Sequence, residues 1–161
     1  MKIIFLDFDG VLNSVRSAHA FGGYPWNINP ESIKQFDPIA LTTIRNFCND
    51  YDIKIVVSST WRKSFSPEDL GKALDLPIID KTPDFHMSRS RGLEIQSWFV
   101  NNPGEYEYAI IDDDSDMLET QLTRFIQTDP YEGFGWKNLM QLYSLFNIPY
   151  RKRLNTKQRI K

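Results

Sequence analysis

The chain has 161 residues, enough for one domain with its own core, and 41% of them are hydrophobic. A formal net charge of −2 gives no global field that would favour nucleic acid or a membrane surface. A single cysteine excludes an intrachain disulfide and a thiolate metal cluster, so we expect a reducing, cytoplasmic location. No apolar stretch approaches the roughly 20 residues of a membrane helix, and the N-terminus lacks a signal-peptide pattern.

The first predicted element is a buried strand that ends in carboxylates. Residues 3–6, IIFL, form a continuous apolar run, which is typical of a strand buried on both faces. The sequence Asp7-Phe8-Asp9-Gly10 follows. In a strand, Asp7 and Asp9 would share a face, and such close like charges favour a bound cation or a raised pKa. The alternative is an exposed acidic turn that caps a helix.

Residues 14–30 show no clear period. Two glycines and a proline interrupt any regular element there. Three aromatic residues make the segment too apolar for a free linker: Phe21, Tyr24 and Trp26. We expect either a short flap over the mouth of the first strand or an ordered surface loop.

The remaining chain alternates between apolar runs and amphipathic segments. Further strands are predicted at residues 53–57, 77–80, 106–111 and 122–127. Helices are predicted at residues 38–51, 67–74, 93–101 and 137–146. Cys48 falls on an apolar helix face and is expected in the core. The alternation predicts an α/β fold, a Rossmann-like three-layer sandwich with a central parallel sheet.

The charge is uneven along the chain. Residues 150–161 contain six Lys or Arg and no acid, which leaves 13 basic and 21 acidic residues in the remainder. We therefore divide the chain into a folded domain at 1–149 and a basic C-terminal tail at 150–161. The tail is either a solvated terminus or a segment that binds nucleic-acid phosphates.

Three predicted strands end in groups that carry chemistry. They run out into Asp7 and Asp9, into Ser58-Ser59 with Arg62 nearby, and into Asp112-Asp113. The carboxyl ends of parallel strands meet at one edge of the sheet, where ligands bind. Aspartates without histidine or cysteine suit Mg²⁺, and hydroxyl groups with an arginine suit a phosphoryl group. One aspartate can attack phosphorus while a second protonates the leaving oxygen and then activates water.

These motifs resemble those of the haloacid dehalogenase (HAD) superfamily of phosphotransferases. The first motif is matched by DFDGV at residues 7–11. The resemblance implies Asp7 as the nucleophile and Asp9 as the general acid/base, with both on the metal, Asp9 through its backbone carbonyl. An acid at Asp9 favours phosphoryl chemistry over dehalogenation, because a leaving alkoxide needs a proton and a halide does not.

The second and fourth motifs of the superfamily are also matched. Ser58 closes the apolar run IKIVV, and the backbone of Ser59 would help to bind the phosphoryl oxygens. Asp112 would be a direct Mg²⁺ ligand, and Asp113 would bind directly or through water.

The third motif is usually a lysine before a helix. Arg91 stands in that place and would bind the substrate phosphate, with Arg89 and Lys81 as rivals. The patterns DFDGVLN, SSTWR, RGxEIxxW and IIDDD resemble the HAD domain linked to RNA-repair proteins, which is related to polynucleotide 3′-phosphatases. In that group Arg62 would touch the substrate phosphate; the alternative is a surface arginine at a helix start. The sequence contains no P-loop, so we expect no kinase half in it.

Three nearby residues have two interpretations each. Trp61 either stacks a base or packs on the sheet as a rim aromatic. Asp114 and Asp116 either cap the following turn or reach the metal.

The resemblance implies a Mg²⁺-dependent phosphomonoester hydrolase that forms an aspartyl-phosphate. Residues 14–30 are too few for a full cap domain, and an uncapped mouth admits large substrates. We therefore expect the phosphate on a nucleotide or polynucleotide end as the substrate. The alternatives are a phosphatase of small metabolites, such as nucleoside monophosphates or sugar phosphates, and a scaffold that binds nucleic acid with little turnover.

Overall fold

A computed structural model of the chain describes residues 1–85 and 90–150. One sheet is built from strands β1 (Lys2–Leu6), β2 (Ile53–Val57), β3 (Ile78–Lys81), β4 (Glu107–Asp112) and β5 (Phe125–Gln127). These strands are all parallel, in the order β3-β2-β1-β4-β5. The chain runs outward from β1 to β3 and then crosses to β4 on the other side. The topological switch point therefore lies between β1 and β4, where ligands bind in open α/β sheets.

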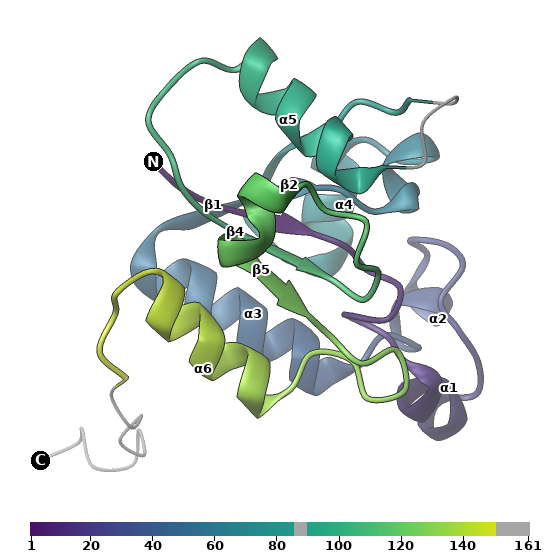
Figure 1. Cartoon of the computed structure of the whole chain (residues 1–161). Helices are drawn as coiled ribbons and strands as arrows, with labels where there is room; N and C mark the ends of the chain where they lie inside the picture. Colours follow the sequence, from purple (N-terminus) through teal and green to yellow (C-terminus); the bar gives the residue numbers. More distant parts are fainter. Residues whose placement is uncertain (86–89, 151–161) are drawn as a thin grey trace, which may run out of the picture.

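Helices cover both faces of the sheet, as Figure 1 shows. One face carries α3 (Pro38–Tyr51), α4 (Pro67–Leu74) and α6 (Trp136–Leu145), and the other carries α5 (Arg91–Asn101). The short helices α1 (Val15–Phe21) and α2 (Pro30–Ile33) lie between β1 and α3, and two 3₁₀ turns complete the set, η1 (Thr60–Lys63) and η2 (Glu119–Arg124). The predicted three-layer α/β fold is confirmed.

The side chains of β1 supply both halves of the core. Ile4 and Leu6 pack in the larger cluster, with residues of α3, α4 and α6. Ile3 and Phe5 pack in the smaller cluster, where the edge of the Phe5 ring meets Trp98 of α5. All four β1 residues are fully buried, because successive side chains enter opposite faces of the sheet.

The predicted start of α3 is confirmed by its hydrogen bonds. The Asp37 side chain accepts from the N–H groups of Ile39 and Ala40, and Pro38 occupies the first helical position. Cys48 lies in the core as expected, and burial raises the pKa of its thiol to about 12.

Residues 14–30 contain a helix where the sequence predicted no regular element. Ser14 and Ser17 form a capping box at the start of α1, in which each hydroxyl accepts the other residue's N–H. The next two N–H groups, of Val15 and Arg16, donate to carbonyls in the loop 129–135. These tertiary bonds compensate for the brevity of α1, and the two glycines fall just beyond its end.

The predicted strand at 122–127 is wrong in its first half. Residues 119–124 form η2 instead, and only residues 125–127 pair with β4. The apolar Leu122 is half exposed, whereas the polar Gln121 is buried and closes the turn by accepting from the Leu118 N–H. Gln121 also donates to the Gly92 carbonyl at the start of α5, so a tertiary contact overrides the local apolar pattern.

The basic segment 151–161 lies outside the described residues, so its role stays a prediction. Tyr150, the first residue of the predicted tail, packs its ring against Trp136 and Tyr143 of α6, with ring centroids 5.3 and 5.4 Å away. Among residues 1–85 and 90–150, no helix is long and apolar enough to cross a membrane.

Candidate active site

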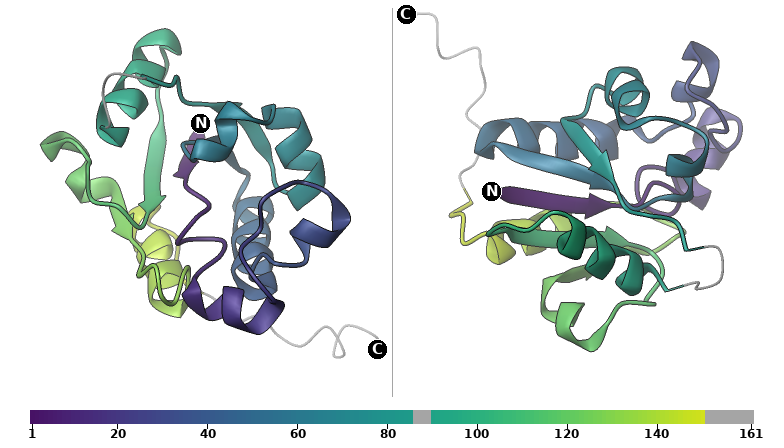
Figure 2. Two further views of the ribbon diagram at one scale, coloured as in Figure 1. Left: turned by 90° about the vertical axis from the view of Figure 1, so that its right-hand side faces the viewer. Right: turned by 90° about the horizontal axis from the view of Figure 1, so that it is seen from above.

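The carboxyl ends of three strands converge at the centre of the sheet. The registers of β1 with β2 and with β4 place Asp7, Ser58 and Asp112 side by side, just beyond the last paired residues. The Asp7 N–H donates to the Ile111 carbonyl at 3.0 Å, and the Ser58 N–H donates to the Leu6 carbonyl at 3.1 Å. Figure 2, in its left view, looks onto this edge of the sheet, where α1 and α2 also lie.

Three aspartates form a carboxylate cluster at this edge, namely Asp7, Asp112 and Asp113. One oxygen from each lies within 4.8 Å of the others. Asp7 is 5% exposed and Asp112 is fully buried, and their carboxylates lie 3.7 and 3.1 Å from the guanidinium of Arg91. A largely buried set of three carboxylates, all oxygen donors, fits Mg²⁺. The Asp9 side chain is not part of this cluster, so a ligand role for its backbone carbonyl stays a prediction.

Burial and mutual repulsion change how the cluster titrates. Burial, followed by the charge of Asp112, raises the pKa of Asp7 to about 8, and Arg91 opposes this rise. Burial raises the pKa of Asp112 to about 6, again against the effect of Arg91. Burial also raises the pKa of Asp113. Without a compensating cation, part of the cluster therefore holds protons at neutral pH.

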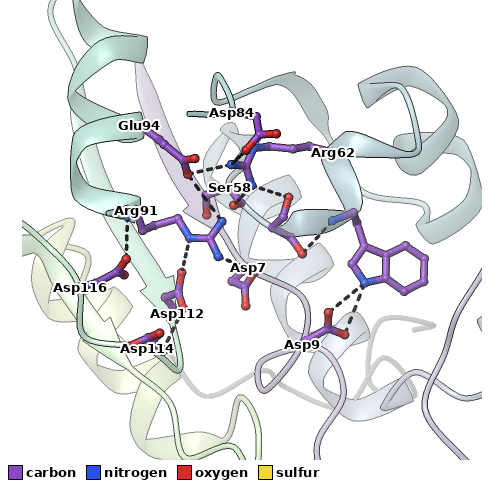
Figure 3. Close-up of polar contacts among 12 residues, drawn as sticks. Asp7, Asp9, Ser58, Arg62, Asp84, Arg91, Glu94, Asp112, Asp114 and Asp116 are labelled. Carbon is purple, nitrogen blue, oxygen red and sulfur yellow. Dashed lines mark hydrogen bonds and ion pairs between the residues drawn. The ribbon is translucent and has the colours of Figure 1, made fainter. Parts of the chain in front are cut away.

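Arg91 at the start of α5 points its guanidinium at the cluster, as Figure 3 shows. Its Nη2 lies 3.7 Å from Asp7 Oδ1, and its Nε lies 3.1 Å from Asp112 Oδ2. The rival Lys81 donates from Nζ to a backbone carbonyl of η1, at Arg62, and not to the cluster. The other rival, Arg89, lies outside the described residues. Of the described candidates for the third motif, Arg91 is the one in contact with the carboxylates.

The turn after β1 depends on a glycine. Gly10 has φ +76°, and a Cβ built on it would lie 2.5 Å from the carboxylate of Asp113. Only a residue without a side chain allows this backbone to approach the cluster so closely. The Thr128 hydroxyl holds the turn from the far side by donating to the Gly10 carbonyl at 2.8 Å.

Asp9 is exposed and lies apart from the cluster (Figure 3). Its Oδ1 accepts from Asn13 Nδ2 at 2.8 Å, and its Oδ2 accepts from the indole N–H of Trp61 at 3.2 Å. Trp61 is 8% exposed and packs against the rings of Phe8 and Phe36, which confirms the interpretation of a rim aromatic. Sequence reasoning missed that Asn13 and Trp61 hold Asp9; the polar Asn13, four residues after Asp9, was the available signal.

The two serines after β2 present hydroxyl groups beside Asp7. The Ser58 hydroxyl oxygen is buried and has no hydrogen-bond partner. The Ser59 hydroxyl bonds to the Asp7 carboxylate. A buried hydroxyl without a partner next to a carboxylate is a donor available to a ligand.

Arg62 lies beneath these serines and does not line the cavity over the cluster. It is 2% exposed, so the alternative of a surface arginine is wrong. Its Nη1 donates to the carbonyls of Ser58 and Ser59 at 2.6 and 2.8 Å, and its Nη2 lies 2.7 Å from Glu94 Oε2. Arg62 braces the serine turn, and its contact with a substrate phosphate stays a prediction.

Glu94 links the two arginines of the site and was missed by sequence reasoning. Its Oε2 is paired with Arg62 and lies 4.0 Å from Nη1 of Arg91, one helical turn earlier on α5. The available signal was the i, i+3 spacing of an acid after Arg91. Asp116 caps the same helix, because its Oδ2 accepts from the Arg91 N–H at 2.8 Å; Asp114 accepts from the next N–H in its own turn.

A cavity of about 470 Å³ opens over the cluster. Asp7, Asp9, Arg91 and Asp113 line it together. Tyr24, from the segment between α1 and α2, lines it as well. The volume falls within the range of small-molecule sites, roughly 300–1,000 Å³. Four of the predicted site residues therefore face one hollow.

Comparisons with known proteins agree with this geometry. No curated protein and no solved structure matches the chain significantly. Residues 3–139 match the family described as the HAD domain in Swiss Army Knife RNA repair proteins. The match includes β1 from its second residue onwards, the other four strands and every predicted site residue. The chain therefore belongs to the HAD superfamily, in the family of HAD domains of Swiss Army Knife RNA repair proteins.

Proposed function

We propose that the chain is a Mg²⁺-dependent phosphomonoester hydrolase that works through an aspartyl-phosphate on Asp7. The observation that carries the proposal is the environment of Asp7, which is buried between the carboxylate of Asp112 and the guanidinium of Arg91. Asp9 lies apart at the mouth, where it can serve a different step. Membership of a HAD family supports hydrolase activity of the phosphatase type.

The residues that would hold Mg²⁺ are those of the carboxylate cluster. Asp7 and Asp112 would bind directly, Asp113 directly or through water, and Asp9 through its backbone carbonyl. When bound, the ion would supply positive charge that keeps the carboxylates ionised and balances the phosphate of the substrate. The close approach of one oxygen from each of Asp7, Asp112 and Asp113, within 4.8 Å of one another, supports this assignment.

The first step transfers the phosphoryl group to Asp7. A carboxylate oxygen of Asp7 attacks phosphorus, the ester P–O bond breaks, and the leaving alkoxide takes a proton from Asp9. The hydroxyl of Ser58, the backbone N–H of Ser59 and the guanidinium of Arg91 would hold the phosphoryl oxygens.

The second step restores the enzyme. Water attacks the phosphorus of the aspartyl-phosphate and gives a proton to Asp9, which lost one in the first step. Asp7 is released as a carboxylate, and inorganic phosphate leaves. The hydrogen bonds from Asn13 and Trp61 keep the Asp9 carboxyl oriented towards the mouth during both steps.

The substrate we propose is an end phosphate of a nucleotide or polynucleotide. The description of the matched family, which names RNA repair, supports this choice. The described chain between β1 and α3 contains only α1 and α2 as helices, so no large cap closes the mouth. An open mouth favours a polymer end over a small metabolite.

The nucleophile is tested by Asp7→Asn. We expect this variant to lose Mg²⁺-dependent release of phosphate from an aryl phosphate by at least about 10³-fold, because the attacking carboxylate is gone. Circular dichroism should show an unchanged fold. Activity near that of the wild type would remove the assignment.

The substrate class is tested by a panel. Turnover of a 3′-phosphorylated oligonucleotide is compared with turnover of nucleoside monophosphates and sugar phosphates. We expect the oligonucleotide to have the highest kcat/KM. A preference for sugar phosphates would favour a metabolite phosphatase instead.

A further inference from the structure

Two large aromatic side chains are held in solvent on the segment between α1 and α2. Tyr24 is 53% exposed and Trp26 is 67% exposed, although aromatic rings contribute most to stability when they are buried. The backbone that carries them is well bonded, because the N–H groups of Trp26 and Asn27 both donate to the Ser32 hydroxyl at 2.7 and 2.8 Å. Pro25, between the two rings, is buried. The fold therefore fixes the backbone of the segment but leaves its two rings exposed.

The two exposed rings line the cavity of the candidate site and the second cavity next to it. Tyr24 lines the same cavity as Asp7 and Asp9. Trp26 lines a second cavity of about 220 Å³, which lies next to the first at Thr60, the residue that lines both. Figure 1 shows the segment beside the carboxyl end of β1.

The second cavity has the character of a site for a flat, uncharged ring. The described residues that line it carry no charge: Pro25, Trp26, Thr60, Trp61, Ser64 and Phe65. Aromatic faces stack on nucleobases whatever their sequence, and hydroxyl groups can meet the polar edges of a base. A sugar phosphate has no such face and would leave this surface without a partner.

We propose that Trp26, together with Tyr24, forms a stacking subsite for the unpaired base of the nucleotide whose phosphate lies on Asp7. The inference rests on the proposed function and deepens it, because it makes the base a determinant of specificity. Trp61, the aromatic residue that the sequence offered for stacking, also lines the second cavity, but it is only 8% exposed and its indole N–H donates to Asp9. The stacking role therefore falls to a residue from the segment that crosses the mouth.

The test compares two substrates that differ only in the terminal base. One is a single-stranded oligonucleotide with a phosphorylated terminal nucleotide, and the other carries an abasic sugar phosphate at that end. The measured quantity is kcat/KM for the base-bearing substrate divided by kcat/KM for the abasic one. It is determined in the wild type, in Trp26→Ala and in Trp26→Phe. Trp136→Ala is the matched control, because Trp136 is 61% exposed and lines neither cavity.

We expect Trp26→Ala to lower the ratio by about ten-fold, in line with the loss of one stacked base. Trp26→Phe should restore most of it, since a smaller aromatic face remains. The control variant should keep the wild-type ratio within about two-fold. An unchanged ratio in Trp26→Ala, or an equal fall in Trp136→Ala, would overturn the proposal.

A binding measurement separates failure of the subsite from failure of the hydrolase. Fluorescence anisotropy of the labelled oligonucleotides is measured on Asp7→Asn, with and without Trp26→Ala, and needs no turnover. Weaker binding of only the base-bearing end supports the subsite even if the wild type releases phosphate from no ester. If the wild type releases phosphate but Trp26→Ala changes neither the kcat/KM ratio nor the binding, the proposed hydrolase is supported. The same result contradicts the stacking subsite.

A free nucleotide and a polynucleotide end both supply the base, and a third substrate distinguishes them. A nucleoside monophosphate is assayed in parallel, and its kcat/KM is compared with that of the oligonucleotide. A Trp26-dependent rate on both supports recognition of the base alone. A Trp26-dependent rate only on the oligonucleotide supports recognition of the base at a polymer end. Independence from Trp26 on both substrates contradicts the proposal.

Discussion

The two edges of the sheet carry cavities of opposite character. The cavity at the amino edge is the larger, at about 580 Å³, and is lined by Lys2, Lys54 and Glu107 among others. The ion pair of Lys2 and Glu107 at this cavity is open to water: the two groups lie 4.0 Å apart, with side chains 36% and 56% exposed. The cavity at the carboxyl edge is smaller, at about 470 Å³, yet it contains the buried Asp7.

The comparison of the two cavities shows that buried charges indicate the functional site better than the volume of the cavity does. Exposed ion pairs contribute little to stability, and they need no ligand to compensate their charges. Buried carboxylates that repel one another destabilise the fold, so the cluster of Asp7, Asp112 and Asp113 needs a compensating partner. That need is what a cation would meet.

The largest effect is expected from Asp112→Asn, which should lower activity and raise stability. The variant should lose about 10² to 10³-fold in kcat/KM, because a carboxylate that we propose to hold the metal and that faces Arg91 is neutralised. The same change should raise the melting temperature of the metal-free protein at pH 8 by about 2 °C or more, since a buried charge is removed. Calorimetry in EDTA and a phosphate-release assay measure the two effects. A melting temperature that falls together with activity would mean that the carboxylate supports the fold instead.

The pH dependence of the Mg²⁺ effect sharpens the same contrast. The pKa of Asp7 is raised from 3.8 to about 8, so between these values the folded chain holds a proton that the unfolded chain has lost. The free energy of unfolding of the metal-free protein therefore falls, on account of this group, as the pH rises from about 4 to about 8. Because Mg²⁺ must displace this proton at lower pH, it should raise the melting temperature more at pH 8.5 than at pH 6.

Thermal melts with and without Mg²⁺ at the two pH values measure this prediction. Asp7→Asn is the control, because it removes the titrating group and should reduce the difference. An equal shift of the melting temperature at both pH values in the wild type would contradict the predicted coupling.

A smaller effect is expected from Arg91→Lys. The change keeps the charge near Asp7 but loses the planar fork that faces Asp7 and Asp112 together, so kcat/KM should fall about ten-fold. Lys81→Ala should stay within about two-fold of the wild type, because Lys81 donates only to the Arg62 carbonyl among its described contacts. A loss of kcat/KM of more than about two-fold in Lys81→Ala would instead assign the third motif to Lys81.

The smallest effect is expected at the amino edge. Glu107→Gln removes the partner of Lys2 in a pair that is exposed and 4.0 Å long. Activity and melting temperature should both stay at their wild-type values within error, because water already screens this pair. A loss of activity here would break the contrast between the two edges.

The strands of the candidate site were predictable because their signals are local. The runs at 3–6 and 53–57 fill β2 and all but the first residue of β1, and a parallel arrangement brings their ends together by topology alone. Asp7, Ser58 and Asp112 could therefore be grouped from the sequence without any knowledge of contacts.

The supporting residues could not be predicted, because their roles arise from contacts between distant parts of the chain. The burial of Arg62 follows from Glu94, on a helix 32 residues later, and no local pattern at Arg62 indicates it. The indole of Trp61 reaches Asp9 across 52 residues. Helix α1 was missed because its stability comes largely from carbonyls of the loop 129–135. Sequence periodicity reports local preference and is silent on such partners.

The central position of β1 has a consequence for synthesis on the ribosome. Asp7 is made early, but its neighbours Ser58 and Asp112 follow only with β2 and β4. Chains fold from the N-terminus as they emerge, so a nascent chain that ends before Glu107 carries Asp7 without the Asp112 carboxylate beside it. The three carboxylates of the cluster can therefore come together only late in synthesis. On the proposed function, a translation product truncated before β4 would retain Asp7 but lack two of the carboxylates proposed to hold the divalent ion.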